Sequence, residues 1–188
     1  MHRRVIYGRN AAAQIKRCGS STEYAVTEQL KMPSFRTQRI VKHSPRAMFE
    51  LVSDVERYPE FLPLCERLVV HSRERKDNGR EEIVASMSVG YGPINETFTT
   101  RVQLDREAHK ILVNYVDGPF RHLENSWSFH SHGDGCRVEF SIVYEFRSIA
   151  FGMMMGALFD RAFRKFAEAF EARADEIYGG EGTALNQA

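Results

Sequence analysis

The fold is decided by residues 138–178, which read VEFSIVYEFRSIAFGMMMGALFDRAFRKFAEAFEARADEIY. At the start of this stretch, apolar residues alternate with polar or small ones, which predicts a strand with one apolar face. From about Ile149 to Tyr178, apolar residues recur every three or four positions and predict one long amphipathic helix, which Gly179-Gly180 ends. Both apolar surfaces are buried only if the helix packs on the sheet.

The residues before this stretch predict the rest of the sheet. Between Cys65 and Ser148 several runs alternate apolar and polar residues, and turn signals at 77–79, 92–93, 117–119 and 133–135 separate them. A strand over 35–43 and two short helical segments come earlier, with Ser44 as the expected N-cap of the first helix. The predicted class is α+β: a curved antiparallel sheet of about seven strands wrapped on a long C-terminal helix, with two short helices after the first strand.

Composition narrows the class of protein. The 188 residues are 43% hydrophobic and 27% charged, which are globular proportions, and 26 basic residues nearly balance 25 acidic ones. This balance argues against a strongly cationic nucleic-acid binder. The longest uncharged apolar stretch, 149–159, is shorter than the roughly 20 residues that span a bilayer. Three cysteines without paired spacing favour a reducing compartment over a disulfide or zinc scaffold.

The N-terminal segment differs from the rest of the chain. Residues 1–31 hold six Lys and Arg against two Glu, a net charge of +4, and have no continuous apolar run. One interpretation is an Arg-rich transit peptide; the other is a disordered leader or mis-assigned start, with Met32 as the true first residue. The second is favoured because the patterned sequence begins directly after Met32. We therefore expect a leader at 1–32, one domain at 33–178 and a disordered tail at 179–188.

Three motifs carry a resemblance to a known family. The run 49–65, FELVSDVERYPEFLPLC, is similar to a signature of the coenzyme Q-binding START-domain proteins. Residues 117–129, DGPFRHLENSWSF, are similar to that family's second signature, and FEARA at 170–174 matches the end of its last helix. The resemblance covers 33–178 and implies the helix-grip (START-like) fold. The same family includes bacterial members labelled ribosome-association toxins of the RatA type.

The resemblance implies non-catalytic binding of a polyprenyl quinone (ubiquinone) or a related isoprenoid lipid, in a carrier that supports respiration. We expect the ring and the nearest isoprenes inside and the distal tail outside. Two alternatives remain: a ribosome-binding factor that blocks subunit joining, and a small-molecule cyclase. Residues 33–178 hold 20 basic and 22 acidic residues, which disfavours RNA binding except through a local patch such as Arg73, Arg75, Lys76 and Arg80.

The strand and helix periodicities predict which residues face the space between the sheet and the long helix, and these are the candidate pocket walls. For each of them, ordinary core packing is the alternative. The sheet offers Phe98, Val102, Tyr115, Trp127, Phe129, Phe140 and Tyr144. The helix offers Met155, Leu158, Phe159, Phe163 and Phe166. The hydroxyls of Tyr115 and Tyr144 and the Trp127 indole are candidate donors to a quinone carbonyl.

Apolar residues also gather in turn-rich segments and at the start of the long helix. We expect them to form the pocket mouth and to touch a membrane transiently; the alternative is a helix start buried under the loops. These candidate mouth residues are Tyr58, Phe61, Leu62, Phe120, Phe151, Met153 and Met154.

We find no sequence signature of an enzyme. His130, His132 and Cys136 form the one cluster that resembles metal ligands, and a solvated hairpin end is the better interpretation. Glu81 and Glu82 project to opposite faces of a strand and cannot act as a pair. The expected location is cytoplasmic and peripheral on the inner (respiratory) membrane, or mitochondrial if the leader is a transit peptide. Contact with respiratory complexes and homodimer formation stay open.

Overall fold

The computed structural model describes residues 32–76 and 79–179. Within these ranges the predicted class is confirmed: one curved antiparallel sheet of seven strands, two short helices after the first strand, and a long C-terminal helix. All of the expected leader except Met32, nearly all of the expected tail and the first two residues of the predicted 77–79 turn lie outside the described residues.

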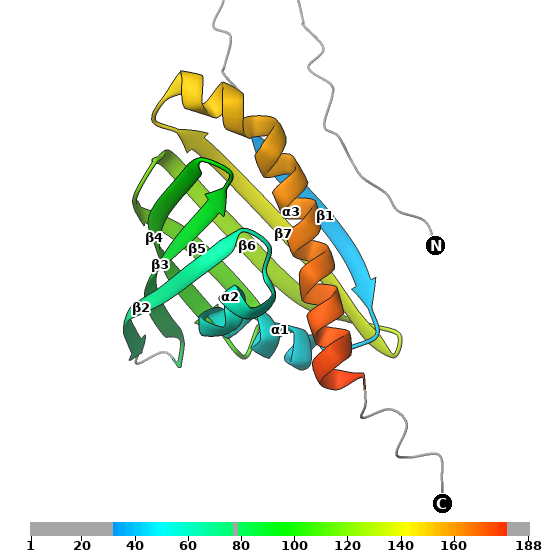
Figure 1. Cartoon of the computed structure of the whole chain (residues 1–188). Helices are drawn as coiled ribbons and strands as arrows, with labels where there is room; N and C mark the ends of the chain where they lie inside the picture. Colours follow the sequence, from blue (N-terminus) through cyan, green and yellow to red (C-terminus); the bar gives the residue numbers. More distant parts are fainter. Residues whose placement is uncertain (1–31, 77–78, 180–188) are drawn as a thin grey trace, which may run out of the picture.

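The strands follow one another in a meander, except that the first strand returns to pair with the last. The order in the sheet is β1-β7-β6-β5-β4-β3-β2. Helix α3 lies across the concave face of this sheet, and α1 and α2 close one end (Figure 1). The elements are β1 (Ser34–Val41), α1 (Pro45–Ser53), the 3₁₀ turn η1 (Val55–Arg57), α2 (Tyr58–Phe61), β2 (Cys65–Arg75), β3 (Glu81–Tyr91), β4 (Ile94–Asp105), β5 (Lys110–Asp117), β6 (Phe120–His132), β7 (Gly135–Phe146) and α3 (Ile149–Tyr178).

Local sequence explains where the helices begin. The Ser44 hydroxyl accepts a hydrogen bond from the Ala47 backbone N–H at 3.1 Å, so the predicted N-cap of α1 is confirmed. Ser148 caps α3 in the same way, accepting from the Phe151 N–H at 3.2 Å. The bounds of α3 agree with the predicted helix.

One turn places a loop against the sheet. Gly118 joins β5 to β6 with a φ of +131°, and a Cβ there would lie 2.8 Å from the Cβ of Phe98. Only glycine fits both the conformation and the space. This close approach holds the β5–β6 turn against β4, beside Phe120.

Two hydrophobic clusters share the space between the sheet and α3. The closed-end cluster, next to α1 and α2, includes Phe49, Val52, Leu104, Phe129, Phe170 and Ala174. The open-end cluster, under the N-terminal half of α3, consists of Phe120, Leu123, Phe140, Ile142, Tyr144, Phe146, Met155 and Phe163. Trp127 and Phe166 contact both clusters, so the two form one continuous core.

Candidate ligand-binding pocket

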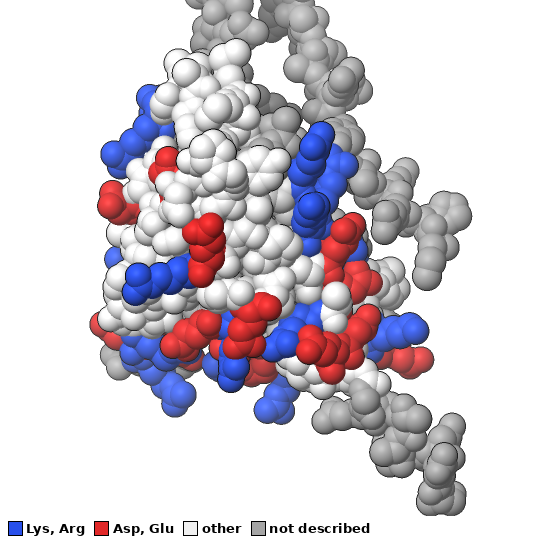
Figure 2. Space-filling view, in the orientation of Figure 1, with Lys and Arg blue, Asp and Glu red and all other residues white. Residues whose placement is uncertain are grey.

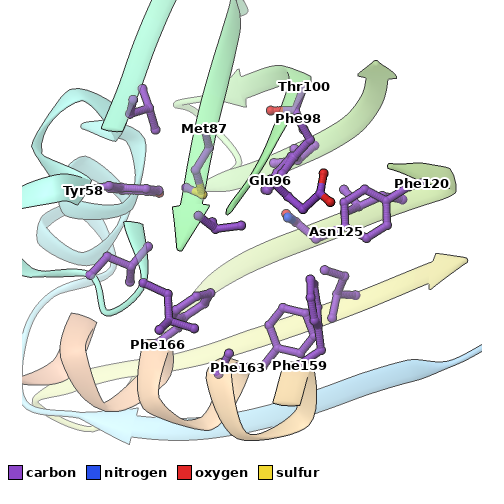
Figure 3. Close-up of a pocket in the computed structure, with 18 of the residues that line it drawn as sticks. Tyr58, Met87, Glu96, Phe98, Thr100, Phe120, Asn125, Phe159, Phe163 and Phe166 are labelled. Carbon is purple, nitrogen blue, oxygen red and sulfur yellow. The ribbon is translucent and has the colours of Figure 1, made fainter. Parts of the chain in front are cut away.

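A cavity of about 160 Å³ remains between the concave sheet face and α3. Its walls come from the short helical segments over 52–58, from β2 to β7 and from the α3 side chains that face the sheet, and they are almost entirely carbon (Figure 3). An apolar cavity of about 150 Å³ is large enough to hold a benzene molecule. The pocket therefore has room for a ring-sized apolar group, but not for a long chain.

Most of the predicted wall residues line this cavity. Leu158 lies on α3, but its side chain is outside the part of the chain that the structure describes. Tyr115, Phe129 and Tyr144 are not among the lining residues. The predicted residues that do line it are Phe98, Val102, Trp127, Phe140, Met155, Phe159, Phe163 and Phe166.

The three exceptions face the core but pack beside the cavity. The Phe129 ring lies 6.2 Å from the ring of Phe49 in the closed-end cluster. The Tyr144 ring lies 5.5 Å from that of Phe159, and the Tyr115 ring 5.9 Å from that of Phe120. Alternation along a strand gives the face of the sheet correctly, but it does not say which inward residues reach the cavity.

Sequence reasoning missed one wall of the pocket. Leu64, Leu68, Met87 and Val89 line it from the β2–β3 side, and Val52 and Val55 line it from the first helical segments. The alternation of apolar and polar residues through Met87 and Val89 could have indicated that these two side chains face the pocket. No pattern in the sequence, however, indicates that β3 curls around to meet a helix 70 residues later.

Three polar residues on the concave face were also missed. Glu96 and Thr100 extend from β4 and Asn125 from β6, and all three line the pocket (Figure 3). Asn125 is paired across the sheet with Val113 and Ile142, so it interrupts an otherwise apolar surface. Its Oδ1 is buried, and no hydrogen-bond partner is found among the described residues. Strand alternation could have found them, because Glu96 shares a face with Phe98 and Asn125 with Trp127.

Of the three segments expected to form the mouth, two lie together, because the rings of Phe120 and Phe151 both contact that of Phe146, and the Tyr58–Leu62 segment lies apart from them. Tyr58 and Phe61 both pack on Phe170 with ring centroids 5.3 Å away, and Leu62 is buried. Phe170 follows Met153 on α3 by 17 residues, or about 25 Å along the helix. Phe120 is buried beneath Phe146 in the open-end cluster. Among the expected mouth residues, Met153 and Met154 at the start of α3 are the ones exposed to solvent.

The pocket approaches the surface at the open end. Tyr91, at the end of β3, is 51% exposed and is the one lining residue in the described ranges classed as exposed. On α3, Met153 is 82% and Met154 60% exposed, while Phe151 and Met155 line the pocket. A largely uncharged area runs from the top of this face down its centre (Figure 2).

The closed end is held by buried rings and ion pairs. His43 Nε2 lies 2.7 Å from Asp175 Oδ1, and the Arg173 guanidinium donates to Glu60 at 2.9 Å. The Tyr58 hydroxyl donates to the Val52 carbonyl oxygen at 2.5 Å. Burial raises the pKa of Tyr58 above its ordinary value, so this phenol stays protonated and acts as a structural donor.

The basic hairpin between β2 and β3 is largely neutralised. Arg73 pairs with Glu81 at 2.7 Å and with Glu56 at 3.0 Å, and Lys76 pairs with Glu74 at 2.8 Å. Burial raises the pKa of Glu81, but hydrogen bonds from Arg73 and Arg106 outweigh that effect and hold it below the ordinary range. Little uncompensated positive charge remains there for RNA.

No metal-binding cluster of three or more His, Cys, Asp or Glu side chains occurs within residues 32–76 and 79–179. His130 lies 3.9 Å from Glu139 at the partly exposed end of β6. No helix in the described ranges is both long and apolar enough to cross a membrane.

Comparisons with solved structures agree with this architecture. The 18 kDa protein CC1736 from Caulobacter crescentus superimposes with a TM-score of 0.67 at 36% identity, over 79% of this chain and 99% of that one. A START superfamily protein from Mycobacterium smegmatis gives a TM-score of 0.65 at 20% identity, over 77% and 98% of the two chains. The second likeness concerns the fold alone.

Comparisons with named proteins point to one family. The chain is 33% identical over 153 residues to the ribosome association toxin RatA of Escherichia coli, covering 80% of this chain and 92% of that one. It is 27% identical to the mitochondrial coenzyme Q-binding protein COQ10 homolog B of Xenopus laevis, over 82% of this chain and 63% of that one. The profile of the family described as polyketide cyclase / dehydrase and lipid transport matches residues 41–171. The chain belongs to this START-like family.

Proposed function

We propose that the protein binds the ring end of a polyprenyl quinone, or of a related isoprenoid lipid, without chemistry and carries it in support of respiratory electron transport. The observation that supports this most is the apolar cavity between the sheet and α3. Its volume suits one ring-sized group. The named relative that binds coenzyme Q is consistent with such a ligand.

A long tail has to remain outside this cavity. Leaving one five-carbon isoprene in water costs about 4 kcal/mol, at about 0.8 kcal/mol for each buried carbon group. The tail therefore stays in a membrane while the ring enters the pocket. This arrangement requires the pocket opening to meet the lipid surface.

The open end supplies suitable contacts for a membrane. Met153 and Met154 project from the same turns of α3 whose Phe151 and Met155 line the pocket. Methionine side chains adapt to irregular apolar surroundings, and an exposed apolar patch is typical of lipid or partner contacts. We place the protein peripherally on the inner respiratory membrane.

Vesicle transfer tests this contact. Ubiquinone exchange between phosphatidylcholine–phosphatidylglycerol vesicles should slow about tenfold with Met153→Glu, because the variant loses roughly one buried apolar side chain at the lipid surface. Ile177→Glu is the matched control, since Ile177 is 46% exposed on the same helix at the closed end. Equal slowing by the two variants would contradict the proposed orientation.

A non-catalytic role agrees with the pocket's ionisable groups. Within the described lining, Glu96 is the single carboxylate, and the Tyr58 hydroxyl is engaged with the Val52 carbonyl. General acid–base chemistry needs a second group within reach of the same substrate atom. A cyclase is therefore disfavoured, although the family description includes cyclases.

Ribosome association is the second candidate, favoured by the named relatives that are 33–36% identical. In the β2–β3 hairpin, Arg75 is exposed and has no ion pair within the described ranges, unlike Arg73 and Lys76. Co-sedimentation with ribosomes that disappears in the variant with Arg73, Arg75, Lys76 and Arg80 replaced by Ala would support this candidate. Absence of co-sedimentation by the unaltered protein would exclude it.

A further inference from the structure

The pocket contains a polar site that apolar binding alone does not explain. Glu96 and Asn125 project into it from two different strands (Figure 3). Among the described residues, neither side chain has a hydrogen-bond or ion-pair partner, and the Oδ1 of Asn125 is fully buried. A buried polar atom without a partner lowers stability, so one that faces a cavity points to a ligand group that completes it.

We propose that Glu96 and Asn125 hold the head group of the ligand and that they favour one with hydroxyl donors, which for a quinone is the reduced quinol. This inference rests on the proposed function and specifies the redox form that the pocket binds best. The hydroxyl of Thr100, on the same face of β4 as Glu96, adds a third polar group at the site.

The hydrogen-bonding groups of the site indicate which redox form of the ligand binds more tightly. An ionised carboxylate only accepts hydrogen bonds, so the half-buried Glu96 can pair with a ligand only where the ligand supplies a donor. Asn125 adds a buried acceptor in Oδ1. Glu96 decides the direction, because its oxygens accept whichever way the Asn125 amide is turned.

The two redox forms present different groups to this site. A benzoquinone has carbonyl oxygens, which only accept, whereas its quinol has two O–H donors on opposite sides of the ring. β5 separates β4 from β6, and the register sets Asn125 level with Val102 of β4, so Glu96 lies six residues nearer the open end than Asn125 does. A quinol at the open end can donate one hydroxyl to Glu96 and direct the other inward toward Asn125, whereas a quinone offers the carboxylate no donor.

Sites built to bond a hydroxyl reject analogues that lack it, because their own buried polar groups are then left unsatisfied. Hydroxyl–carboxylate bonds are also the stronger, charge-assisted kind. We expect decylubiquinol to bind at least about tenfold more tightly than decylubiquinone.

Anaerobic isothermal titration of the lipid-free protein with these two compounds tests the proposal. Glu96→Gln should bring the two dissociation constants within about threefold of each other, mainly by weakening quinol binding, because glutamine adds a donor and removes the charge. Asn125→Leu should weaken both forms and the quinol more. The matched control is Glu124→Gln, which alters a carboxylate one residue from Asn125 on the outer face and should leave both constants unchanged.

The outcomes separate this inference from the proposed function. Equal binding of quinone and quinol by the unaltered protein, or a quinol preference that survives Glu96→Gln, overturns the head-group site while leaving the carrier intact. Failure of both compounds to bind overturns the carrier proposal and this inference with it. Unchanged thermal unfolding of Glu96→Gln shows that its binding change is local.

Discussion

The two ends of the space under α3 are built differently, although one helix covers both. At the closed end, rings from α1, α2, β6 and α3 pack together, and the His43–Asp175 hydrogen bond and the Arg173–Glu60 ion pair join the elements. The cavity is lined by residues of both clusters but approaches the surface at the open end, where Ile149 and Met153 are 80% and 82% exposed. We infer that the closed end carries most of the stability of the fold, so that the open end can be packed less completely.

The largest expected effect is at the closed end. Phe49 is 1% exposed and lies 6.2 Å from Phe129 and 5.9 Å from His109, measured between ring centroids. Phe49→Ala should lower the free energy of unfolding by about 3–5 kcal/mol, since it leaves a void in close-packed core. Urea denaturation followed by circular dichroism measures the loss; a change below 1 kcal/mol would show that this end does not carry the stability.

Truncating a phenylalanine to alanine at the open end should lower the free energy of unfolding by less. Phe159 is half-buried and already borders the cavity, so Phe159→Ala enlarges an existing space. We expect a loss of about 1–2 kcal/mol, together with weaker ligand binding, because part of the wall is gone. Parallel denaturation and ligand titration of the two alanine variants measure the contrast. Equal stability losses would remove the distinction between the ends.

Lowering the pH should reduce the free energy of unfolding, because Glu81 at the closed end becomes protonated. Its pKa is lowered from 4.5 by Arg73 and Arg106, so its contribution to stability is complete above that unfolded-state value and is lost as the pH falls through the lower folded value. The stability difference between the unaltered protein and Glu81→Gln should therefore be largest near neutral pH and shrink below pH 4.5. Unfolding curves across this range check it, and a difference independent of pH would contradict it.

The smallest expected effect concerns an ion pair at the closed end. Arg173 joins α3 to Glu60 of α2, and its guanidinium lies 5.7 Å from the centre of the Phe61 ring. Arg173→Met keeps most of the apolar stem, so we expect a loss of about 0.5–1 kcal/mol. The shift in the urea midpoint measures it, and a loss as large as that of Phe49→Ala would mean that charge rather than packing holds this end.

The fold could be predicted because its determinants are local in the sequence. The alternation that ends at Phe146 and the helical spacing from Ile149 specify a strand and a helix whose apolar faces need each other. The Ser44 cap and the glycine-containing turns fix where the neighbouring elements begin. These patterns gave the architecture without reference to distant contacts.

The site was less predictable because it depends on the curvature of the sheet. Strand alternation placed Tyr144 and Trp127 on the same apolar face, yet only Trp127 reaches the cavity. The Tyr58–Leu62 segment was predicted to be part of the mouth, but the rings of Tyr58 and Phe61 pack on Phe170 at the closed end. Asn125 was overlooked because a single polar residue in a strand with apolar residues on the same face is not unusual. Only the structure shows that its side-chain oxygen is buried without a hydrogen-bond partner among the described residues.

Extraction of the purified protein tests directly whether its cavity holds a lipid. The protein is purified from cells that make quinone, and its organic extract is quantified by mass spectrometry. We expect about one prenylated quinone or related isoprenoid lipid for each chain, and its loss in Phe163→Glu, whose carboxylate would enter the apolar wall. Circular dichroism confirms that this variant is folded. An extract without such a lipid from the folded, unaltered protein would contradict the account.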